Sequence, residues 1–311
     1  MEKCEQFNSR DLELVKACDL CGGSKFEPEL VAGDWNLFRC NDCGLVFTSP
    51  RYTEAYLQKM YEDLYYEIAP SYLSAQLLEP SEDEYCLAKS LMKICGSPRG
   101  SQTPKVLDIG CGGGLIVNAF QNAGWEAVGI DLSWKAVSAG KSRGLDLRVA
   151  GINNSELGKF DLVAAFHVVE HVHGPREFLR NCADRLVKNG YILIEVPDYG
   201  CRAVQKMRQN WPYLYPDKHL YQFTNGTLGR YLAQANFDLI KIEKVHGRGL
   251  VQGYGSSSIG KVKNRNSFKN VLLRLRGLFY WSPKGRRGLR HLFCHTLGYG
   301  EFIRVLARKS Y

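Results

Sequence analysis

The sequence of 311 residues predicts a doubly wound α/β fold built on a mostly parallel sheet. From residue 106 onward, short apolar runs alternate with helix-length segments, and strands buried on both faces of a parallel sheet have this composition. A cluster of glycines follows the first apolar run, and the second run ends in an acid. Both features therefore fall at the carboxyl edge of the sheet, where open α/β sheets bind ligands.

The predicted strands and helices keep alternating after the glycine cluster. Helix boundaries coincide with proline or glycine, and the second helix begins at Ser133, a good capping residue, and ends at Gly144. The strands are predicted at residues 106–109, 126–130, 145–150, 160–166, 191–198, 237–245 and 301–309, and the helices at 115–123, 133–144, 175–190 and from about 224.

Composition divides the chain into three regions. Residues 1–50 contain two pairs of cysteines, and residues 51–100 are tyrosine-rich and end in a linker of turn-forming residues. We expect residues 51–100 to form a helical lid whose tyrosines Tyr61, Tyr65 or Tyr66 line a pocket, although an amphipathic helix packed on the main domain has the same pattern. Residues 101–311 form the main domain, with a basic helical insertion at about 248–297.

Four of the eleven cysteines form two C-x2-C-G pairs, Cys18 with Cys21 and Cys40 with Cys43. This spacing lets four thiolates surround one tetrahedral Zn²⁺, and the following glycines permit the tight turns. A redox pair or four unrelated thiols are the alternatives. Because the protein fills all four positions, such a zinc would be structural. Few basic residues lie between the pairs, which argues against a nucleic-acid-binding ribbon.

The glycine cluster has the sequence GCGGG, in which Gly110, Gly112 and Gly114 form a G-x-G-x-G pattern. Glycine lets the backbone approach a ligand where a Cβ would collide with it. A dinucleotide site prefers G-x-G-x-x-G, and the sixth position here is Leu115, which argues against NAD without excluding it. Asp131, about 20 residues on, would hold a ribose in either case.

The glycine turn, the spaced acid and a later phrase resemble class I S-adenosylmethionine-dependent methyltransferases. The later phrase is EHV, followed by proline, by FL, and by leucine and glycine before the strand at 191–198. This pattern is similar to the type that includes ubiquinone-pathway O-methyltransferases and deoxysugar methyltransferases, some of which carry an N-terminal zinc segment. The resemblance implies a seven-stranded Rossmann-like methyltransferase sheet with a small zinc ribbon, a helical lid and S-adenosylmethionine as cofactor.

The resemblance also implies roles for residues at the donor site. Asp108 would order the turn and the methionine amino end, the turn would wrap the methionine and the ribose, and Asp131 would accept bonds from both ribose hydroxyls. The implied donor-binding residues are Asp108, Gly110, Cys111, Gly112, Gly114, Asp131, Leu132, Asn153 and His167.

The histidines near this edge are the candidate catalytic residues. Methyl transfer from a sulfonium is an in-line displacement, so alignment of the acceptor and exclusion of water are the main requirements. A hydroxyl acceptor, or a carbon beside a carbonyl, also loses a proton, and histidine titrates in the right range. We expect His171 or His219 to be the base, with Glu170 as an orienting partner. A structural histidine bonded to the backbone is the alternative for each.

The net charge of +9 is concentrated in residues 248–311, which hold 14 lysines and arginines against one acid, Glu301. This region could meet a phosphorylated substrate, an anionic membrane or nucleic acid, or could be a solvated basic face. We expect a small-molecule acceptor, either a sugar or a nucleotide-linked sugar. The alternative is O-methylation of a quinone-like or other lipid precursor, with peripheral membrane contact through the basic insertion. A non-catalytic nucleotide-binding regulator is a third hypothesis.

Other partners and locations are disfavoured by the sequence. The strand at 160–166 leads into HVVEHV and lacks the motif that flips a target base, so no nucleic acid partner is expected. No run approaches the ~18 to 20 apolar residues of a membrane span, and the N-terminus lacks the apolar core of a signal peptide. These features predict a cytoplasmic protein, and no feature indicates an oligomeric state.

Overall fold

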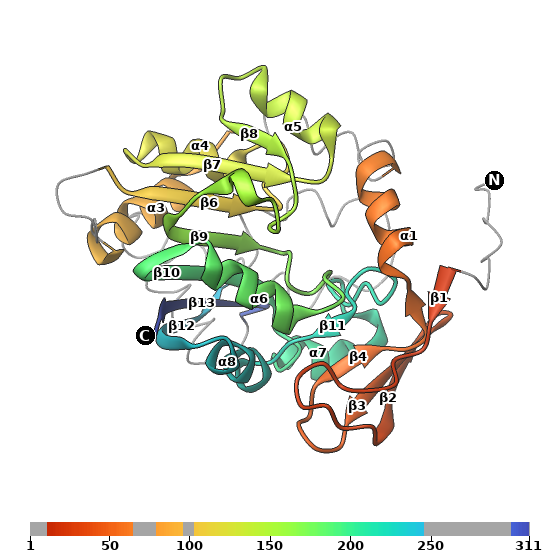
Figure 1. The fold of residues 1–311 in the computed structure, drawn as a ribbon. Coiled ribbons are helices and arrows are strands. Elements are labelled where there is room, and N and C mark those ends of the chain that lie inside the picture. Colours follow the sequence, from red (N-terminus) through yellow and green to blue (C-terminus); the bar gives the residue numbers. More distant parts are fainter. Residues whose placement is uncertain (1–10, 65–78, 96–102, 246–299, 311) are drawn as a thin grey trace, which may run out of the picture.

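The computed structural model describes residues 11–64, 79–95, 103–245 and 300–310. It contains a central sheet, helices on both faces of that sheet, and a smaller sheet at one side (Figure 1). The predicted basic insertion at 248–297 lies outside the described residues, as do Tyr65 and Tyr66 of the predicted lid.

The central sheet has seven strands, which confirms the predicted fold class. They are β6 (Lys105–Ile109), β7 (Glu126–Asp131), β8 (Leu147–Val149), β9 (Phe160–Phe166), β10 (Leu186–Pro197), β12 (Phe237–Val245) and β13 (Phe302–Lys309). Their order is β12-β13-β10-β9-β6-β7-β8, and β13 alone among them runs antiparallel to its neighbours. From β6 the chain adds β7 and β8 on one side of the sheet, and β9 and β10 then follow on the other side. The boundary between β6 and β9 is therefore the switch point at which such sheets bind ligands.

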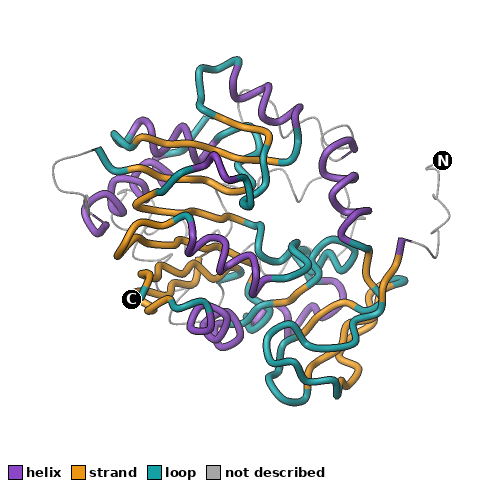
Figure 2. The backbone as a smooth tube through the Cα atoms, viewed as in Figure 1, coloured by secondary structure: helices purple, strands orange, loops and turns teal. Residues whose placement is uncertain are grey.

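Two helical layers cover the sheet, as Figure 2 shows. The helices are α3 (Glu82–Cys95), α4 (Leu115–Asn122), α5 (Trp134–Lys141), α6 (Pro175–Asp184) and α8 (Asn225–Gln234). Successive residues of a strand point to opposite faces. In β9, Val163 and Ala165 therefore pack with α6 and α8, whereas Leu162 and Ala164 pack with α3 and α4.

Side-chain caps mark the starts of α5 and α8. Ser133 accepts a hydrogen bond from the Ala136 amide at the start of α5, as predicted from the sequence. Thr224 and Thr227 form reciprocal capping bonds at the start of α8. These caps fix where the helices leave the carboxyl edge of the sheet.

The predicted helix at 175–190 is wrong at its C-terminal end. α6 ends at Asp184, and Leu186 already pairs with Phe160 in the sheet. A register shift follows Leu186, so Gly190 lies in an irregular part of β10 and does not end a helix. Burial of Leu186 between the two layers outweighs the helical pattern of the segment.

The N-terminal segment forms a second sheet that also includes a strand of the main domain. This sheet has four strands in the order β11-β4-β3-β2, namely β11 (Tyr221–Gln222), β4 (Val46–Thr48), β3 (Trp35–Cys40) and β2 (Phe26–Ala32). A separate two-stranded sheet pairs β1 (Leu12–Glu13) with β5 (Arg51–Tyr52). Leu20 and Phe47 belong to the same buried core as Leu228 and Tyr231 of α8. The ribbon, defined as residues 11–52, thus shares a core with the sheet.

The segment after the ribbon is helical where it is described. α1 (Glu54–Lys59) continues into the π-helical turn η2 (Met60–Leu64), and Figure 1 shows α1 above the ribbon, to the right of the central sheet. Shorter helical turns are η4 (Ser155–Leu157), α7 (Arg202–Met207) and η5 (Arg208–Asn210). Within the described ranges, none of the helices has the length and apolar character that a membrane crossing requires.

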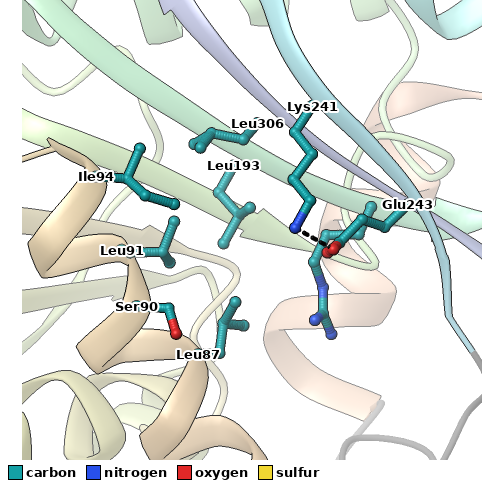
Figure 3. Close-up of a pocket in the computed structure, with 9 residues that line it drawn as sticks. Leu87, Ser90, Leu91, Ile94, Leu193, Lys241, Glu243 and Leu306 are labelled. Atoms are coloured by element: carbon teal, nitrogen blue, oxygen red, sulfur yellow. Dashed lines mark ion pairs between the residues drawn. The ribbon is translucent and has the colours of Figure 1, made fainter. Parts of the chain in front are cut away.

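A groove lies between α3 and the outer strands of the sheet (Figure 3). Leu91 and Ile94 of α3 face Leu193 of β10 and Leu306 of β13 across it, and an ion pair between two β12 side chains borders it. Its lining includes none of the predicted site residues. The chemistry-bearing side chains gather instead at the carboxyl edge of β6, β7 and β9.

Candidate active site

The turn after β6, with the sequence GCGGG, requires glycine at its first, third and fifth residues. Gly110, Gly112 and Gly114 have φ values of 67°, 52° and 89°, in the left-handed region that side chains disfavour. A Cβ on Gly110 would lie 2.5 Å from Cγ2 of Val168, and one on Gly114 would lie 2.5 Å from Cδ1 of Leu145. The turn therefore packs directly against the segment that follows β9.

The Asp131 carboxylate fastens this turn to the end of β7. Its Oδ2 accepts a hydrogen bond from the Gly112 amide at 2.9 Å, and its Oδ1 accepts one from the Ser133 amide at 2.8 Å. The Cys111 amide donates to the Ile130 carbonyl at 3.0 Å beside them. Each carboxylate oxygen has more than one acceptor site, so Asp131 retains capacity for two hydroxyl donors.

A second carboxylate, Asp108, is buried beside the first. Burial raises the pKa of Asp108 well above its usual range, and the negative charge of Asp131 raises it further. Burial also raises the pKa of Asp131, although the amides of Ser133 and Gly112 work against that shift. A cationic group bound here would reverse both shifts, because an opposite charge favours the ionised carboxylate. Such an edge fits a ligand with hydroxyls and a positive charge.

The other residues predicted to bind the donor lie around the same edge. Leu132 directly follows Asp131 and is 36% exposed, and Asn153 is exposed in the loop after β8. The buried Cys111 thiol lies 3.5 Å from the Gly112 carbonyl. The adjacent parallel strands β6, β7 and β8 thus deliver these residues to one end of the sheet.

His167, also predicted to bind the donor, lies between two buried glutamates. Its φ of 55° is uncommon for a residue with a side chain. Nδ1 lies 3.5 Å from Oε1 of Glu170, and Nε2 lies 3.4 Å from Oε1 of Glu195, which also pairs with Arg304. Burial opposes the charge of His167, but the glutamates outweigh it and raise its pKa to about 9. His167 is therefore a cationic partner of Glu170, and its contact with a donor stays a prediction.

The two predicted base histidines lie together although 48 residues separate His171 from His219 in the sequence. Their rings are 4.7 Å apart, edge to face. The Tyr61 hydroxyl lies 2.9 Å from Nδ1 of His171, and the two rings are 5.8 Å apart. A tyrosine of the predicted lid therefore contacts the histidine cluster.

Backbone carbonyls fix the orientation of both imidazoles. Nδ1 of His219 lies 2.9 Å from the Tyr213 carbonyl, and Nδ1 of His171 lies 3.0 Å from the Lys218 carbonyl. A carbonyl oxygen only accepts, so each Nδ1 carries the proton and each Nε2 keeps its lone pair. Burial lowers the pKa of both histidines, and for His219 the electrostatic influence of the neighbouring His171 and His167 lowers it further. Both rings are therefore neutral, and each can accept a proton or bind a metal ion through Nε2.

Glu170 completes the cluster. Both of its carboxylate oxygens are buried and have no hydrogen-bond partner among the described residues. A ligating atom from each of Glu170, His171 and His219 lies within 4.8 Å of the others, which is close enough for one divalent ion. The arrangement offers a general base with an acidic neighbour, or alternatively a three-ligand metal site.

The four predicted zinc ligands also come together. Sγ of Cys18 lies 3.5 Å from Sγ of Cys43, Sγ of Cys21 lies 3.5 Å from Sγ of Cys40, and all four lie within 4.8 Å of one another. Zn–S bonds of about 2.3 Å in a tetrahedron require separations of this size. Burial raises the pKa of the Cys43 thiol to about 11, so a bound cation would be needed to hold the thiolate form.

Several residues of the site were not predicted from the sequence. Glu195 pairs with both His167 and Arg304, and Arg51 and Tyr221 connect the ribbon to the segment after β9. The sequence does indicate Glu195, because a charged residue inside the apolar run YILIEVP needs a buried partner. The other three lie far from their partners in sequence, and no local pattern marks them.

The comparisons with known proteins agree with this geometry. A family model described as a methyltransferase domain matches residues 81–242, just over half of the chain. The chain belongs to this methyltransferase family. The match begins at α3 and includes the glycine turn, Asp131 and the histidine cluster. The predicted class I methyltransferase family is thereby confirmed.

Curated relatives of the methyltransferase domain include ubiquinone biosynthesis O-methyltransferases. That of Bordetella avium is 30% identical over 33% of this chain and 45% of its own length. That of Cupriavidus pinatubonensis is 26% identical over 54% of this chain and 73% of its own length. The match thus spans less than half of the first relative.

Among solved structures, the plantazolicin methyltransferase BpumL in complex with a triazolic desmethylPZN analog and SAH shares the fold. It is 17% identical, with a TM-score of 0.50, and the alignment covers 82% of this chain and 95% of that one. This likeness extends the shared architecture well beyond the region that the family model matches.

Replacement of Asp131 by alanine should weaken binding of S-adenosylhomocysteine by roughly tenfold or more, about 1.4 kcal/mol. The variant loses a buried acceptor and the bond that fastens the Gly112 amide. Isothermal titration measures the effect. Asp146→Ala, which removes an exposed partner of Arg148, is the matched control and should bind as the wild type does. Equal affinity for all three proteins would refute the assignment of the donor site.

Metal analysis of the purified chain should give one zinc per chain, and the double variant Cys18→Ser with Cys21→Ser should lose it, because two of four thiolates are gone. Cys86→Ser, outside the ribbon, is the control and should keep the metal. A chain without zinc would exclude a zinc site at the four ribbon cysteines. A second ion that persists in the double variant would assign a metal to Glu170, His171 and His219.

Proposed function

We propose that this chain transfers the methyl group of S-adenosylmethionine to a hydroxyl of a small-molecule acceptor. Family membership and the paired carboxylates at the switch point support the donor. The observation that carries the reaction type is the neutral histidine pair beside Glu170, because deprotonation of a hydroxyl needs a base at the edge where the donor binds.

The residues of the donor site act by binding and orientation. The donor supplies an electrophilic methyl on a sulfonium. Asp131 accepts bonds from the ribose hydroxyls, and Asp108 provides negative charge toward the methionine amino end. The glycine turn brings backbone amides close to the ligand where side chains would exclude it. Cys111, Leu132 and Asn153 complete the surroundings, and we propose a structural zinc at the four ribbon cysteines.

The residues of the acceptor site take the proton and exclude water. Nε2 of His219 accepts the hydroxyl proton, while its Nδ1–H remains bonded to the Tyr213 carbonyl. Glu170 stabilises the resulting imidazolium, since its buried carboxylate lies within 4.8 Å of the imidazole. Tyr61 covers His171 from the side of η2, and this contact supports a lid role for residues 51–100.

The acceptor that these surroundings fit best is aromatic and quinone-like. Tyr61, His171, His219 and Tyr215 form a continuous series of edge-to-face ring contacts. Planar rings favour such edge-to-face and offset arrangements, so an aromatic acceptor would extend the series. The relatives named as ubiquinone biosynthesis O-methyltransferases favour the same class over the sugar expected from the sequence. We further propose that the basic region 248–297 draws the chain to an anionic surface or substrate.

The function is tested by incubating the full chain with a labelled methyl donor and a panel of catechols, hydroquinones and nucleotide-linked sugars. We expect methylation of an aromatic hydroxyl. His219→Gln should lower kcat by roughly 100-fold, the smaller end of general-base contributions, while its affinity for S-adenosylhomocysteine stays within twofold. If only the sugars are labelled, the quinone-like acceptor is excluded and the sugar acceptor is supported. Full turnover in His219→Gln would exclude His219 as the base.

A further inference from the structure

The ribbon reaches the histidine cluster through β11, the strand that follows His219 almost directly. Tyr221 of β11 pairs with Phe47 of β4, and the Thr48 amide donates to the Leu220 carbonyl at 3.0 Å. On its other side, the Tyr221 amide approaches the Glu170 carbonyl at 3.4 Å. The backbone after His219 is thus held between the ribbon and the segment after β9.

The Tyr221 side chain connects the same two parts. Arg51 Nη1 donates to the Tyr221 hydroxyl at 2.9 Å, and this hydroxyl donates to the His173 carbonyl at 2.8 Å. Nε2 of His173 in turn lies 2.8 Å from the Tyr52 carbonyl. Tyr221 is 3% exposed and Arg51 is 8% exposed, and Glu13 accepts a bond from Arg51 at 2.8 Å. These bonds are buried or partly buried, so water replaces them poorly.

A third contact lies next to the zinc ligands. The Arg176 amide, at the start of α6, donates to the Asp19 carboxylate at 3.2 Å, and the Arg176 guanidinium donates to the Asp19 carbonyl. Asp19 directly follows Cys18. Residues 168–173 are here called the catalytic segment. The segment follows β9, and contacts at His173 and Arg176 join its C-terminal end to the ribbon.

The donor end has a different set of supports. The glycine turn is held by Asp131 of β7, by the Ile130 carbonyl and by packing against Val168 and Leu145. Val168 is the first residue of the catalytic segment, and the other groups belong to β7 and to the loop before β8. Apart from the contact with Val168, the two ends of the site therefore depend on different parts of the fold.

We propose that the ribbon positions the acceptor end of the site, and that Tyr221 and Arg51 are positioning residues that hold the catalytic segment against His219. The expected effect on catalysis rests on the proposed function. The positioning of the segment by the ribbon does not depend on that function. Loss of the Tyr221 hydroxyl would loosen Glu170 and His171 relative to His219 and leave the donor seat intact.

The test compares Tyr221→Phe with a matched control, Tyr199→Phe. Each variant keeps a buried ring and removes one hydroxyl bonded to the ribbon, but the Tyr199 hydroxyl donates to Glu29 of β2 at 3.1 Å and not to the catalytic segment. Amide hydrogen exchange across residues 168–173 should be roughly fivefold faster in Tyr221→Phe and unchanged in Tyr199→Phe. Zinc content and affinity for S-adenosylhomocysteine should match the wild type in both.

Turnover supplies the second readout. In Tyr221→Phe, kcat should fall roughly tenfold with the KM for the donor unchanged, because misplacement affects the reacting groups and not donor binding. Unchanged exchange in Tyr221→Phe would overturn the proposal, and equal acceleration in Tyr199→Phe would do so too. If the wild type methylates no acceptor, the proposed function fails, and the exchange data still decide whether the ribbon positions the segment.

Discussion

The hydrogen bond from the Gly112 amide to the Asp131 carboxylate is the interaction on which the rest of the site depends. It joins the turn after β6 to the end of β7, and it thereby fixes the positions of the left-handed glycines and of the start of α4. It also keeps a carboxylate at a buried edge next to Asp108, where burial raises the pKa of both acids. Such an arrangement is unfavourable unless a ligand supplies hydroxyls and positive charge, and for this reason we propose a binding site there.

The switch point of the sheet then determines what lies opposite the donor. β9 is the parallel neighbour of β6, so the segment after β9 emerges beside the glycine turn, and Val168 touches Gly110. Glu170 and His171 follow within three residues. A second buried network, in which His167 lies between Glu170 and Glu195, supplies the cation that balances these acids. The glycine turn and two residues of the histidine cluster, Glu170 and His171, thus follow adjacent strands of one sheet.

The ribbon is joined to the main domain by more than its linker. Leu20 and Phe47 share a core with α8, and β11 of the main domain completes the ribbon sheet. A small sheet held together by zinc alone could fold without contacts to the rest of the chain. Here it contributes Thr48, Arg51 and Asp19 to bonds around the catalytic segment, so the ribbon and the histidine cluster are structurally connected.

The parts of this molecule that sequence could predict are those encoded by local spacing. The unit from β6 to β7, the two cysteine pairs and the cap at Ser133 are each contained in a short stretch, and each is found where it was expected. The C-terminal end of α6 was mispredicted because pairing of Leu186 with β9 is a tertiary contact. The tie between Arg51 and Tyr221 has the same origin, since 170 residues separate the partners.

A crystal structure of the full chain with S-adenosylhomocysteine would test the central claim most directly. Our account predicts that the ligand lies over the glycine turn with both ribose hydroxyls about 2.7 to 3.0 Å from the Asp131 carboxylate oxygens. A ligand bound elsewhere, or a ribose held by other side chains with Asp131 still bonded only to amides, would contradict it.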